Sequence, residues 1–259
     1  MASEISPKAE ISPKAKIGNN CKIFPFVYIE DDVVIGDNCI IFPFVSILDG
    51  SRIGNNNKIH QGSVIAALPQ DFNYRGEKSY VEIGDNNVIR ENVVINRGTN
   101  RDGFTRVGNH NYLLEGTHIS HDTVVGTNCV FGNGVKIAGD CEIGNGVIFS
   151  TGAIQNANTR AGDMSMIQAG CAFSHDVPPY VIAGGSPMEY GGTNTAIMDF
   201  AGVDKKVQKH IANAYRLLFR GKTSVFDVVN QIRDQVPDGP EIQNIIRFLQ
   251  GTKRGIMCK

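Results

Sequence analysis

Isoleucine occupies every sixth position through the first part of this chain. The series runs without interruption through Ile5, Ile11, Ile17, Ile23, Ile29, Ile35, Ile41, Ile47, Ile53, Ile59 and Ile65. An α-helix repeats its apolar face about every 3.6 residues and a coiled coil about every 3.5, so neither structure matches this period. A six-residue period is typical of a parallel β-helix, in which each repeat forms one short strand and a bend.

The same frame returns after two interruptions, first at Ile83, Ile89 and Ile95 and then from Val107 to Phe173. A second slot, four residues after the large apolar one, holds a small side chain. Its occupants include Cys21, Val27, Val33, Cys39, Val45, Thr117, Thr123, Cys129, Val135, Cys141, Val147, Ala153 and Cys171. Because the cysteines recur in this slot, we interpret them as small buried side chains rather than as zinc ligands or disulfide partners.

The two interruptions predict loops at about 66–80 and 96–106, and loops of this length in a compact solenoid are usually functional. Adjacent prolines at 178 and 179 cannot donate ladder hydrogen bonds, so the repeat domain is expected to span 1–183. A connector and a helical domain are expected over 184–259. About three helices are predicted there, beginning near Asp204, after a capping box at Ser224, and at Pro240.

Composition is consistent with a soluble cytoplasmic protein. The formal net charge is -1 and charged residues make up 20% of the chain. Neither value favours binding to nucleic acid or insertion into a membrane. The N-terminal sequence MASEISPKAE has neither the positively charged start nor the apolar core of a secretory signal, so a cytoplasmic location is expected.

The best candidate for chemistry is the segment HISHD, from His118 to Asp122, which breaks the apolar pattern. A histidine near neutral pH can act as a general base, and a neighbouring carboxylate can fix its tautomer. A pair of solvated surface histidines is the alternative. With an 18-residue coil, Gly139 and then Ala157 would lie above His121. These two small residues would leave a groove for a narrow apolar chain. The Gly139 N–H could then face a developing oxyanion.

Several segments resemble the UDP-N-acetylglucosamine O-acyltransferases of lipid A biosynthesis. They are QDFNYRGE (70–77), IRENVVINRGT (89–99), HISHD, DVPPYVIAGG (176–185) and NAYRLLF (213–219). The resemblance implies a mainly β fold, a left-handed parallel β-helix followed by a C-terminal α-helical domain, assembled as a homotrimer. It also implies transfer of a 3-hydroxyacyl chain from acyl carrier protein to the 3-hydroxyl of UDP-N-acetylglucosamine, the first step of lipid A synthesis, without a metal or organic cofactor.

Residue roles follow from the same resemblance. It implies that His121 is the general base, Asp122 its orienting partner and Gly139 the oxyanion donor. The implied substrate-binding positions are Asp71, His118, Asp140, Asn156 and Asn194. Ala157, Met166 and Ala169 match positions along the acyl chain, and because Ala169 stands where a glycine is expected, a somewhat shorter acyl group is predicted.

Other family positions are changed, mainly on the nucleotide side. Asn73 replaces a lysine, Asp140 a histidine, Asn156 and Ala157 a His-Gln pair, Ala196 a glutamate, and Phe200 and Ala201 two arginines. A paralogue that acylates another sugar nucleotide therefore stays open, as does a non-catalytic trimer that binds a nucleotide or carrier protein. A metalloenzyme of the carbonic anhydrase type is a third alternative, but it requires three converging histidines, and His60, His110 and His175 do not obviously meet His118.

Overall fold

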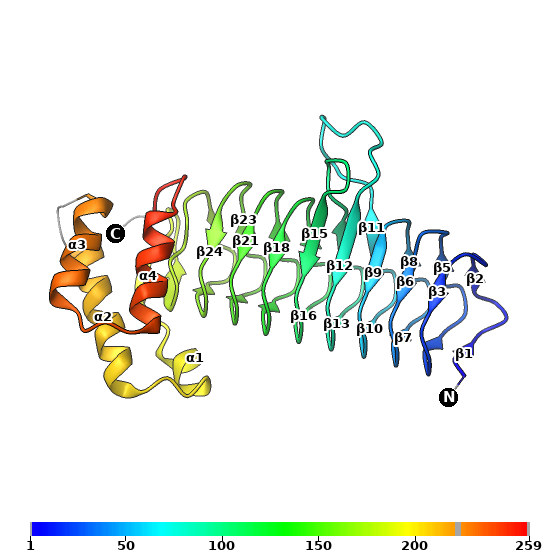
Figure 1. Ribbon diagram of the computed structural model, residues 1–259, viewed down its shortest axis with the longest axis horizontal. Coiled ribbons are helices and arrows are strands. Elements are labelled where there is room, and N and C mark those ends of the chain that lie inside the picture. Colours follow the sequence, from blue (N-terminus) through cyan, green and yellow to red (C-terminus); the bar gives the residue numbers. More distant parts are fainter. Residues whose placement is uncertain (1, 221–223, 258–259) are drawn as a thin grey trace.

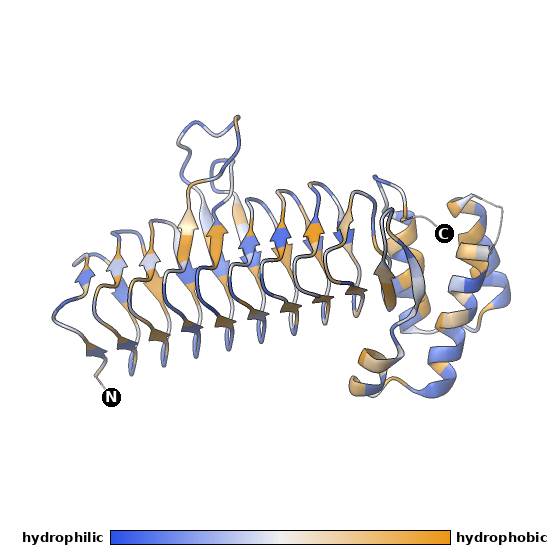
Figure 2. Ribbon diagram, turned by 180° about the vertical axis from the view of Figure 1, so that it is seen from behind, coloured by the Kyte–Doolittle hydropathy of each residue, from blue (hydrophilic) through white to orange (hydrophobic). Residues whose placement is uncertain are grey.

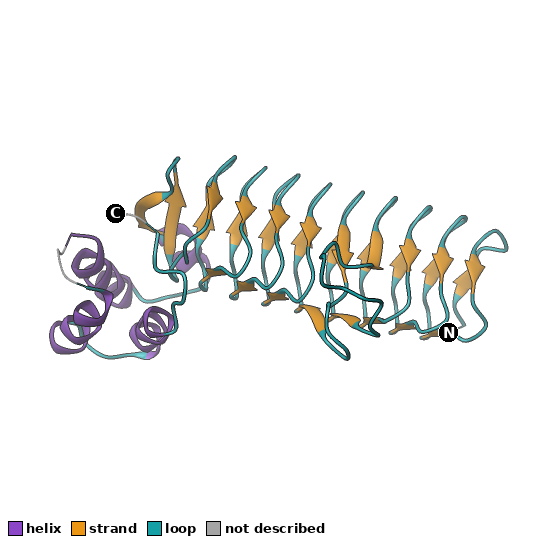
Figure 3. Cartoon of the chain, turned by 90° about the horizontal axis from the view of Figure 1, so that it is seen from above, coloured by secondary structure: helices purple, strands orange, loops and turns teal. Residues whose placement is uncertain are grey.

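The computed structural model describes residues 2–220 and 224–257, and within these ranges the chain forms a prism of three sheets followed by helices (Figure 1). Successive strands belong to successive sheets, so the chain winds around the prism and each sheet is parallel over the repeats. Strands are short and the coils lie side by side along the axis (Figure 3). The expected parallel β-helix is therefore present, with a corner between each pair of strands.

The first sheet comprises β1 (Glu4–Ile5), β4 (Lys22–Ile23), β7 (Ile40–Ile41), β10 (Lys58–Ile59), β13 (Val88–Ile89), β16 (Tyr112–Leu113), β19 (Val130–Phe131), β22 (Ile148–Phe149), β25 (Met166–Ile167), β27 (Val181–Gly184) and β28 (Glu189–Thr193). The second comprises β2 (Glu10–Ile11), β5 (Tyr28–Ile29), β8 (Ser46–Ile47), β11 (Val64–Ala67), β14 (Val94–Asn96), β17 (His118–Ile119), β20 (Lys136–Ile137), β23 (Ile154–Gln155) and β26 (Ala172–Phe173). The third comprises β3 (Lys16–Ile17), β6 (Val34–Ile35), β9 (Ser51–Ile53), β12 (Tyr80–Ile83), β15 (Phe104–Val107), β18 (Val124–Val125), β21 (Glu142–Ile143) and β24 (Arg160–Ala161).

The six-residue frame becomes a set of buried columns. Ile41 pairs with Ile23 on one side and with Ile59 on the other, and all three side chains are buried. All five described cysteines are buried and free, as the small slot predicts. One position of the frame is polar, since Gln155 stands in the core and donates from Nε2 to the Thr159 carbonyl at 2.9 Å.

Two loops leave the prism without disturbing its register. The first loop (68–79) connects β11 to β12, and the second loop (97–103) connects β14 to β15. Both are shorter than expected because the flanking strands extend into them. Partners one coil apart are separated by 18 residues in the regular part but by 30 and 24 residues where a loop is included. Both loops are therefore extra chain inserted at one corner, and they project together from the prism (Figure 1).

The segment expected to be an irregular connector forms structure of its own. β27 continues the first sheet by pairing in parallel with β25, and β28 then pairs with β27 in the antiparallel direction. The prolines at 178 and 179 do not end the sheet, because they lie in the bend before β27 rather than in a ladder position. The hairpin covers the last strand edge of this sheet.

Four helices follow within the described ranges, one more than expected: α1 (Thr195–Phe200), α2 (Lys205–Arg220), α3 (Val225–Gln235) and α4 (Pro240–Gln250). Ser224 caps α3 by accepting a hydrogen bond from the Asp227 N–H, and Pro240 opens α4 as predicted. Apolar and polar residues lie on different faces of α2, α3 and α4 (Figure 2). None of the helices in the described part of the chain has the length and apolar content needed to cross a bilayer.

The helices are fixed to the last coils by specific contacts. Arg160 donates to the Phe248 carbonyl at 2.8 Å, and its guanidinium lies 4.2 Å from the centre of that ring. Asn244 donates to Asp163 Oδ2 at 2.7 Å, while the buried Tyr215 hydroxyl of α2 donates to the Pro179 carbonyl. These contacts close the C-terminal end of the prism.

We predict that Ile41→Ala lowers the free energy of unfolding by about 2–5 kcal/mol, because it empties a position with no solvent exposure in the middle of a column. Ile154→Ala is the matched control, since Ile154 points outward and is 41% exposed. Chemical denaturation followed by circular dichroism measures both changes. Equal losses for the two variants would contradict the assignment of the frame to the core.

Candidate active site

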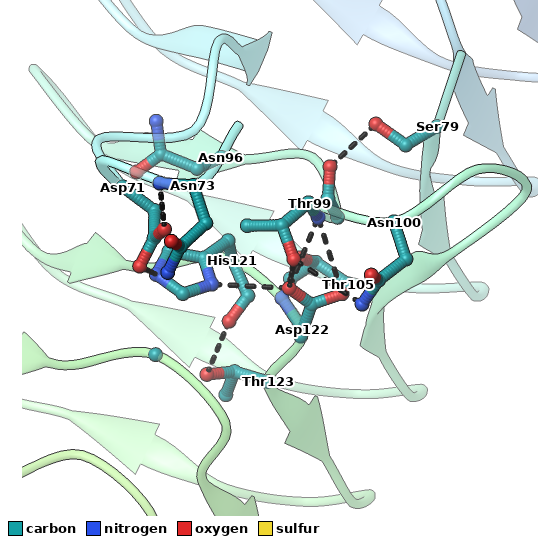
Figure 4. A network of polar contacts seen from close by, with 12 residues as sticks. Asp71, Asn73, Ser79, Asn96, Thr99, Asn100, Thr105, His121, Asp122 and Thr123 are labelled. Carbon is teal, nitrogen blue, oxygen red and sulfur yellow. Dashed lines mark hydrogen bonds and ion pairs between the residues drawn. The ribbon is translucent and has the colours of Figure 1, made fainter. Parts of the chain in front are cut away.

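The candidate site lies at the corner where both loops emerge. His121 follows β17 at this corner, and its side chain is only 10% exposed, so it is not a solvated surface histidine. Figure 4 shows the imidazole between Asp71 on one side and Asp122 on the other. One ring nitrogen therefore faces a carboxylate from the prism, and the other faces a carboxylate from the first loop.

Asp122 holds one nitrogen of the His121 ring. Its Oδ2 lies 3.0 Å from His121 Nδ1, a contact that favours the tautomer with its proton on Nδ1 and its lone pair on Nε2. Asp122 has a left-handed backbone conformation (φ 57°), which polar residues adopt more readily than apolar ones. Its backbone N–H donates to Thr105 Oγ1 at 2.9 Å. The backbone of Asp122 is thus held in a defined turn, and this turn directs its carboxylate toward His121.

Asp71 approaches the other ring nitrogen from the first loop. Its Oδ2 lies 3.7 Å from His121 Nε2, and its Oδ1 accepts a hydrogen bond from the Asn73 N–H at 2.7 Å. The loop is anchored at its base, where Asn96 Nδ2 donates to the Leu68 carbonyl at 2.7 Å. His121 Nε2 and Asp71 Oδ2 therefore lie close enough for one hydroxyl to come within hydrogen-bond distance of both.

Gly139 lies directly against the imidazole, one coil further along the prism. A β-carbon built on Gly139 would be 2.3 Å from His121 Cε1, so only glycine leaves room for the ring. Within residues 2–220 and 224–257, the Gly139 N–H donates to no protein acceptor. A free backbone donor thus stands beside a histidine, which is the arrangement that an oxyanion requires.

His118 and Asp140 border the same corner and have shifted pKa values. Burial, with the nearby charges of Lys136 and His121, lowers the pKa of His118 below the ordinary histidine value. Burial also raises the pKa of the Asp140 carboxyl, and the negative charges of Asp122 and Asp71 act in the same direction. The corner therefore favours a neutral His118 and carries several close carboxyl groups.

The other predicted site residues do not all converge on His121 in a single chain. Asn156 and Ala157 are exposed at the same corner, two coils beyond His121. Met166 and Ala169 lie in and after β25, at another corner of the prism. Asn194 is buried, and its Nδ2 donates to the Met164 carbonyl at 3.0 Å, so it faces the protein rather than an open site.

The structure adds one residue that the sequence did not single out. Thr99 of the second loop donates to Asp122 Oδ2 from its hydroxyl at 2.7 Å and from its backbone N–H at 3.0 Å. Its position inside the segment INRGT was the only available signal, because the second loop carries no periodicity. Among the residues that the structure describes, no three His, Cys, Asp or Glu side chains converge as metal ligands would.

Comparison with known proteins agrees with this geometry. Residues 176–257 match the second domain of the UDP-N-acetylglucosamine O-acyltransferases, and residues 14–41, 34–67 and 104–139 match the bacterial transferase hexapeptide repeat. An acyl-(acyl-carrier-protein)–UDP-N-acetylglucosamine O-acyltransferase from Sulfurihydrogenibium sp. (strain YO3AOP1) is 41% identical over 98% of this chain and 94% of its own length.

Solved structures give the same result. A UDP-N-acetylglucosamine acyltransferase from Bacteroides fragilis 9343 superposes with a TM-score of 0.96 at 47% identity, over 97% of this chain and 99% of that one. The UDP-N-acetylglucosamine acyltransferase of Francisella novicida superposes with a TM-score of 0.95 at 31% identity, over 98% and 94% of the two chains. The prism is accordingly the left-handed parallel β-helix that was expected.

We predict that Lys136→Gln raises the pKa of His118 toward its ordinary value, because the variant removes a neighbouring positive charge. Folding disfavours the protonated His118 ring. The contribution of His118 to the free energy of unfolding is therefore complete above the ordinary histidine pKa, and it is lost as pH falls through the lowered pKa of the folded protein. NMR titration of the His118 ring protons measures the change. Lys136→Arg keeps the charge and should leave the pKa lowered, so equal values in the two variants would refute the electrostatic cause.

Proposed function

Because this chain belongs to the UDP-N-acetylglucosamine O-acyltransferase family, we propose that it transfers an acyl chain from acyl carrier protein to the 3-hydroxyl of UDP-N-acetylglucosamine. It is an acyltransferase that depends on an acylated carrier protein, and the reaction is the first step of lipid A biosynthesis. The observation that supports this proposal most directly is the imidazole of His121, which is held by Asp122 and packed against Gly139.

His121 acts as the general base in this reaction. Its Nε2 takes the proton of the 3-hydroxyl while the hydroxyl oxygen attacks the thioester carbonyl. The resulting oxyanion accepts a hydrogen bond from the free Gly139 N–H. When the intermediate collapses, the C–S bond breaks and the imidazolium returns its proton to the departing thiolate. Asp122 stabilises the imidazolium and fixes the ring orientation through Nδ1.

Polar groups at the corner bind the acceptor sugar. Asp71 Oδ2 lies 3.7 Å from His121 Nε2, so a sugar hydroxyl beside the two could be within hydrogen-bond reach of both. His118, neutral because of its lowered pKa, can donate to or accept from a sugar oxygen without an ionic charge. Asp140 and Asn156 border the same space on the following coils. The acceptor is thus recognised mainly by uncharged groups and carboxyl oxygens.

The protein acts as a homotrimer in this proposal. In one chain, Asn194 is buried against Met164, and Met166 and Ala169 lie at a different corner from His121. A neighbouring prism could bring residues such as Met166 and Ala169 beside the exposed Ala157, two coils beyond His121, where a small side chain leaves room for the acyl chain. Ala169 in place of a glycine narrows the end of that groove, which favours a somewhat shorter acyl group. The substrates place the enzyme in the cytoplasm.

We predict that His121→Ala lowers kcat by about 10²–10⁴-fold, the usual contribution of a general base, while the trimer stays intact. The assay should follow acyl transfer from a panel of acyl carrier proteins to UDP-N-acetylglucosamine and to other sugar nucleotides. Full activity of His121→Ala would refute the mechanism. Wild-type transfer to another sugar nucleotide but not to UDP-N-acetylglucosamine would refute the proposed acceptor. The changes at Phe200 and Ala201 would then mark a paralogue with a different acceptor.

We predict that Gly139→Ala lowers kcat at least about tenfold, because its methyl group would displace the imidazole from a distance of 2.3 Å. Gly239→Ala is the matched control, since Gly239 has an extended backbone (φ 173°) and the nearest atom to a built β-carbon is 3.7 Å away. Steady-state kinetics and a crystal structure of each variant measure the effect. Normal turnover with an undisplaced His121 ring in Gly139→Ala would contradict the close contact.

A further inference from the structure

The second loop reaches the catalytic corner through a single side chain. Thr99 approaches Asp122 with two donors, and both bond to Oδ2, the same oxygen that faces His121 Nδ1. Figure 4 shows Thr99 above Asp122 and Asn100 on the side of Asp122 away from the imidazole. Three donors thus converge on one carboxylate oxygen, and two of them come from Thr99.

We propose that Thr99 is a positioning residue for acyl transfer: it fixes the Asp122 carboxylate so that Oδ2 stays in the hydrogen bond with His121 Nδ1. This inference rests on the proposed role of His121 as the base. A free aspartate side chain can rotate about two bonds, and each rotation would turn Oδ2 away from the ring. Two bonds of 2.7 and 3.0 Å from one residue remove that freedom, and the hydroxyl bond is charge-assisted.

Glycines in the second loop allow this approach. A β-carbon on Gly98 would lie 2.9 Å from Asp122 Oδ1, and one on Gly103 would lie 3.4 Å from the same atom. Glycine backbone therefore lies against Oδ1, while the Thr99 hydroxyl donates to Oδ2 and the Thr99 N–H lies within hydrogen-bond distance of both oxygens. This packing encloses the carboxylate on the side away from His121. The second loop therefore packs onto Asp122 instead of extending into solvent.

Thr99 is not what holds the second loop in place. Ser79 Oγ donates to the Gly98 carbonyl at 2.5 Å, and the Asp102 N–H donates to the Lys78 carbonyl at 2.8 Å. The Arg97 N–H donates to the Ala67 carbonyl at 3.0 Å. These bonds tie the second loop to both ends of the first without using the Thr99 side chain. Removing the Thr99 hydroxyl is therefore expected to leave the loop folded and to affect the carboxylate.

The test uses Thr99→Val, which keeps the shape of the side chain and removes the hydroxyl, and Thr99→Ser, which keeps the hydroxyl. We expect kcat to fall roughly tenfold in Thr99→Val, the size of one lost charge-assisted hydrogen bond, while KM for both substrates changes less than about twofold. Thr99→Ser should recover most of the loss. Unchanged kcat in Thr99→Val, or an equal loss in Thr99→Ser, would overturn the proposal.

A double-mutant cycle with Asp122→Ala separates positioning from general stability. If Thr99 acts through Asp122, Thr99→Val has no further effect on kcat once Asp122 is alanine. Additive losses would show that the hydroxyl acts elsewhere and would overturn the inference. His121→Ala assayed in parallel distinguishes the two proposals: if that variant is inactive while Thr99→Val is normal, only the inference about Thr99 fails, and if His121→Ala is active, the proposed base fails.

Discussion

The parallel pairing of each coil on the previous one is the constraint on which the rest of the structure depends. Ile41 pairs with Ile23 on one side and with Ile59 on the other, and the same pairing continues along each column. Each residue of the repeats therefore has a defined sheet or corner and a defined coil in the prism. The candidate active site follows from this rule, since His121 and Gly139 are partners one coil apart. Close contact between the ring and the glycine is thus a property of the repeat and needs no separate folding event.

The sequence predicts the prism well and the site only in part. The six-residue period is a strong signal because each core position repeats many times, and His121, Asp122 and Gly139 inherit their places from it. Asp71 and Thr99 lie in loops without periodicity, so their approach to His121 depends on contacts such as that between Asn96 and Leu68. The hairpin of β27 and β28 was also missed, because its glycine-rich strands resemble a connector.

The residues that differ from the family pattern lie mainly on the nucleotide side and not beside His121. Where the family pattern has two arginines, Phe200 and Ala201 are exposed, and the nearby Lys205 already pairs with Asp199. Helix α1 (Thr195–Phe200) itself carries no basic side chain. At the candidate active site, by comparison, His121 still lies beside two carboxylates and against Gly139. The changed positions in and after α1 therefore lie on a different part of the fold from the corner at His121.

The two loops illustrate how such a solenoid can acquire new chemistry in evolution. Partners one coil apart are separated by 30 or 24 residues across a loop and by 18 elsewhere, yet the strands on both sides keep the same pairing. Added chain that loops out at a corner therefore leaves all later coils in phase, whereas six added residues that formed a strand of their own would move every later strand to the next sheet. Added chain at a corner keeps the strand pairing, so an insertion there can bring a carboxylate or a hydroxyl beside an existing histidine, as Asp71 and Thr99 show.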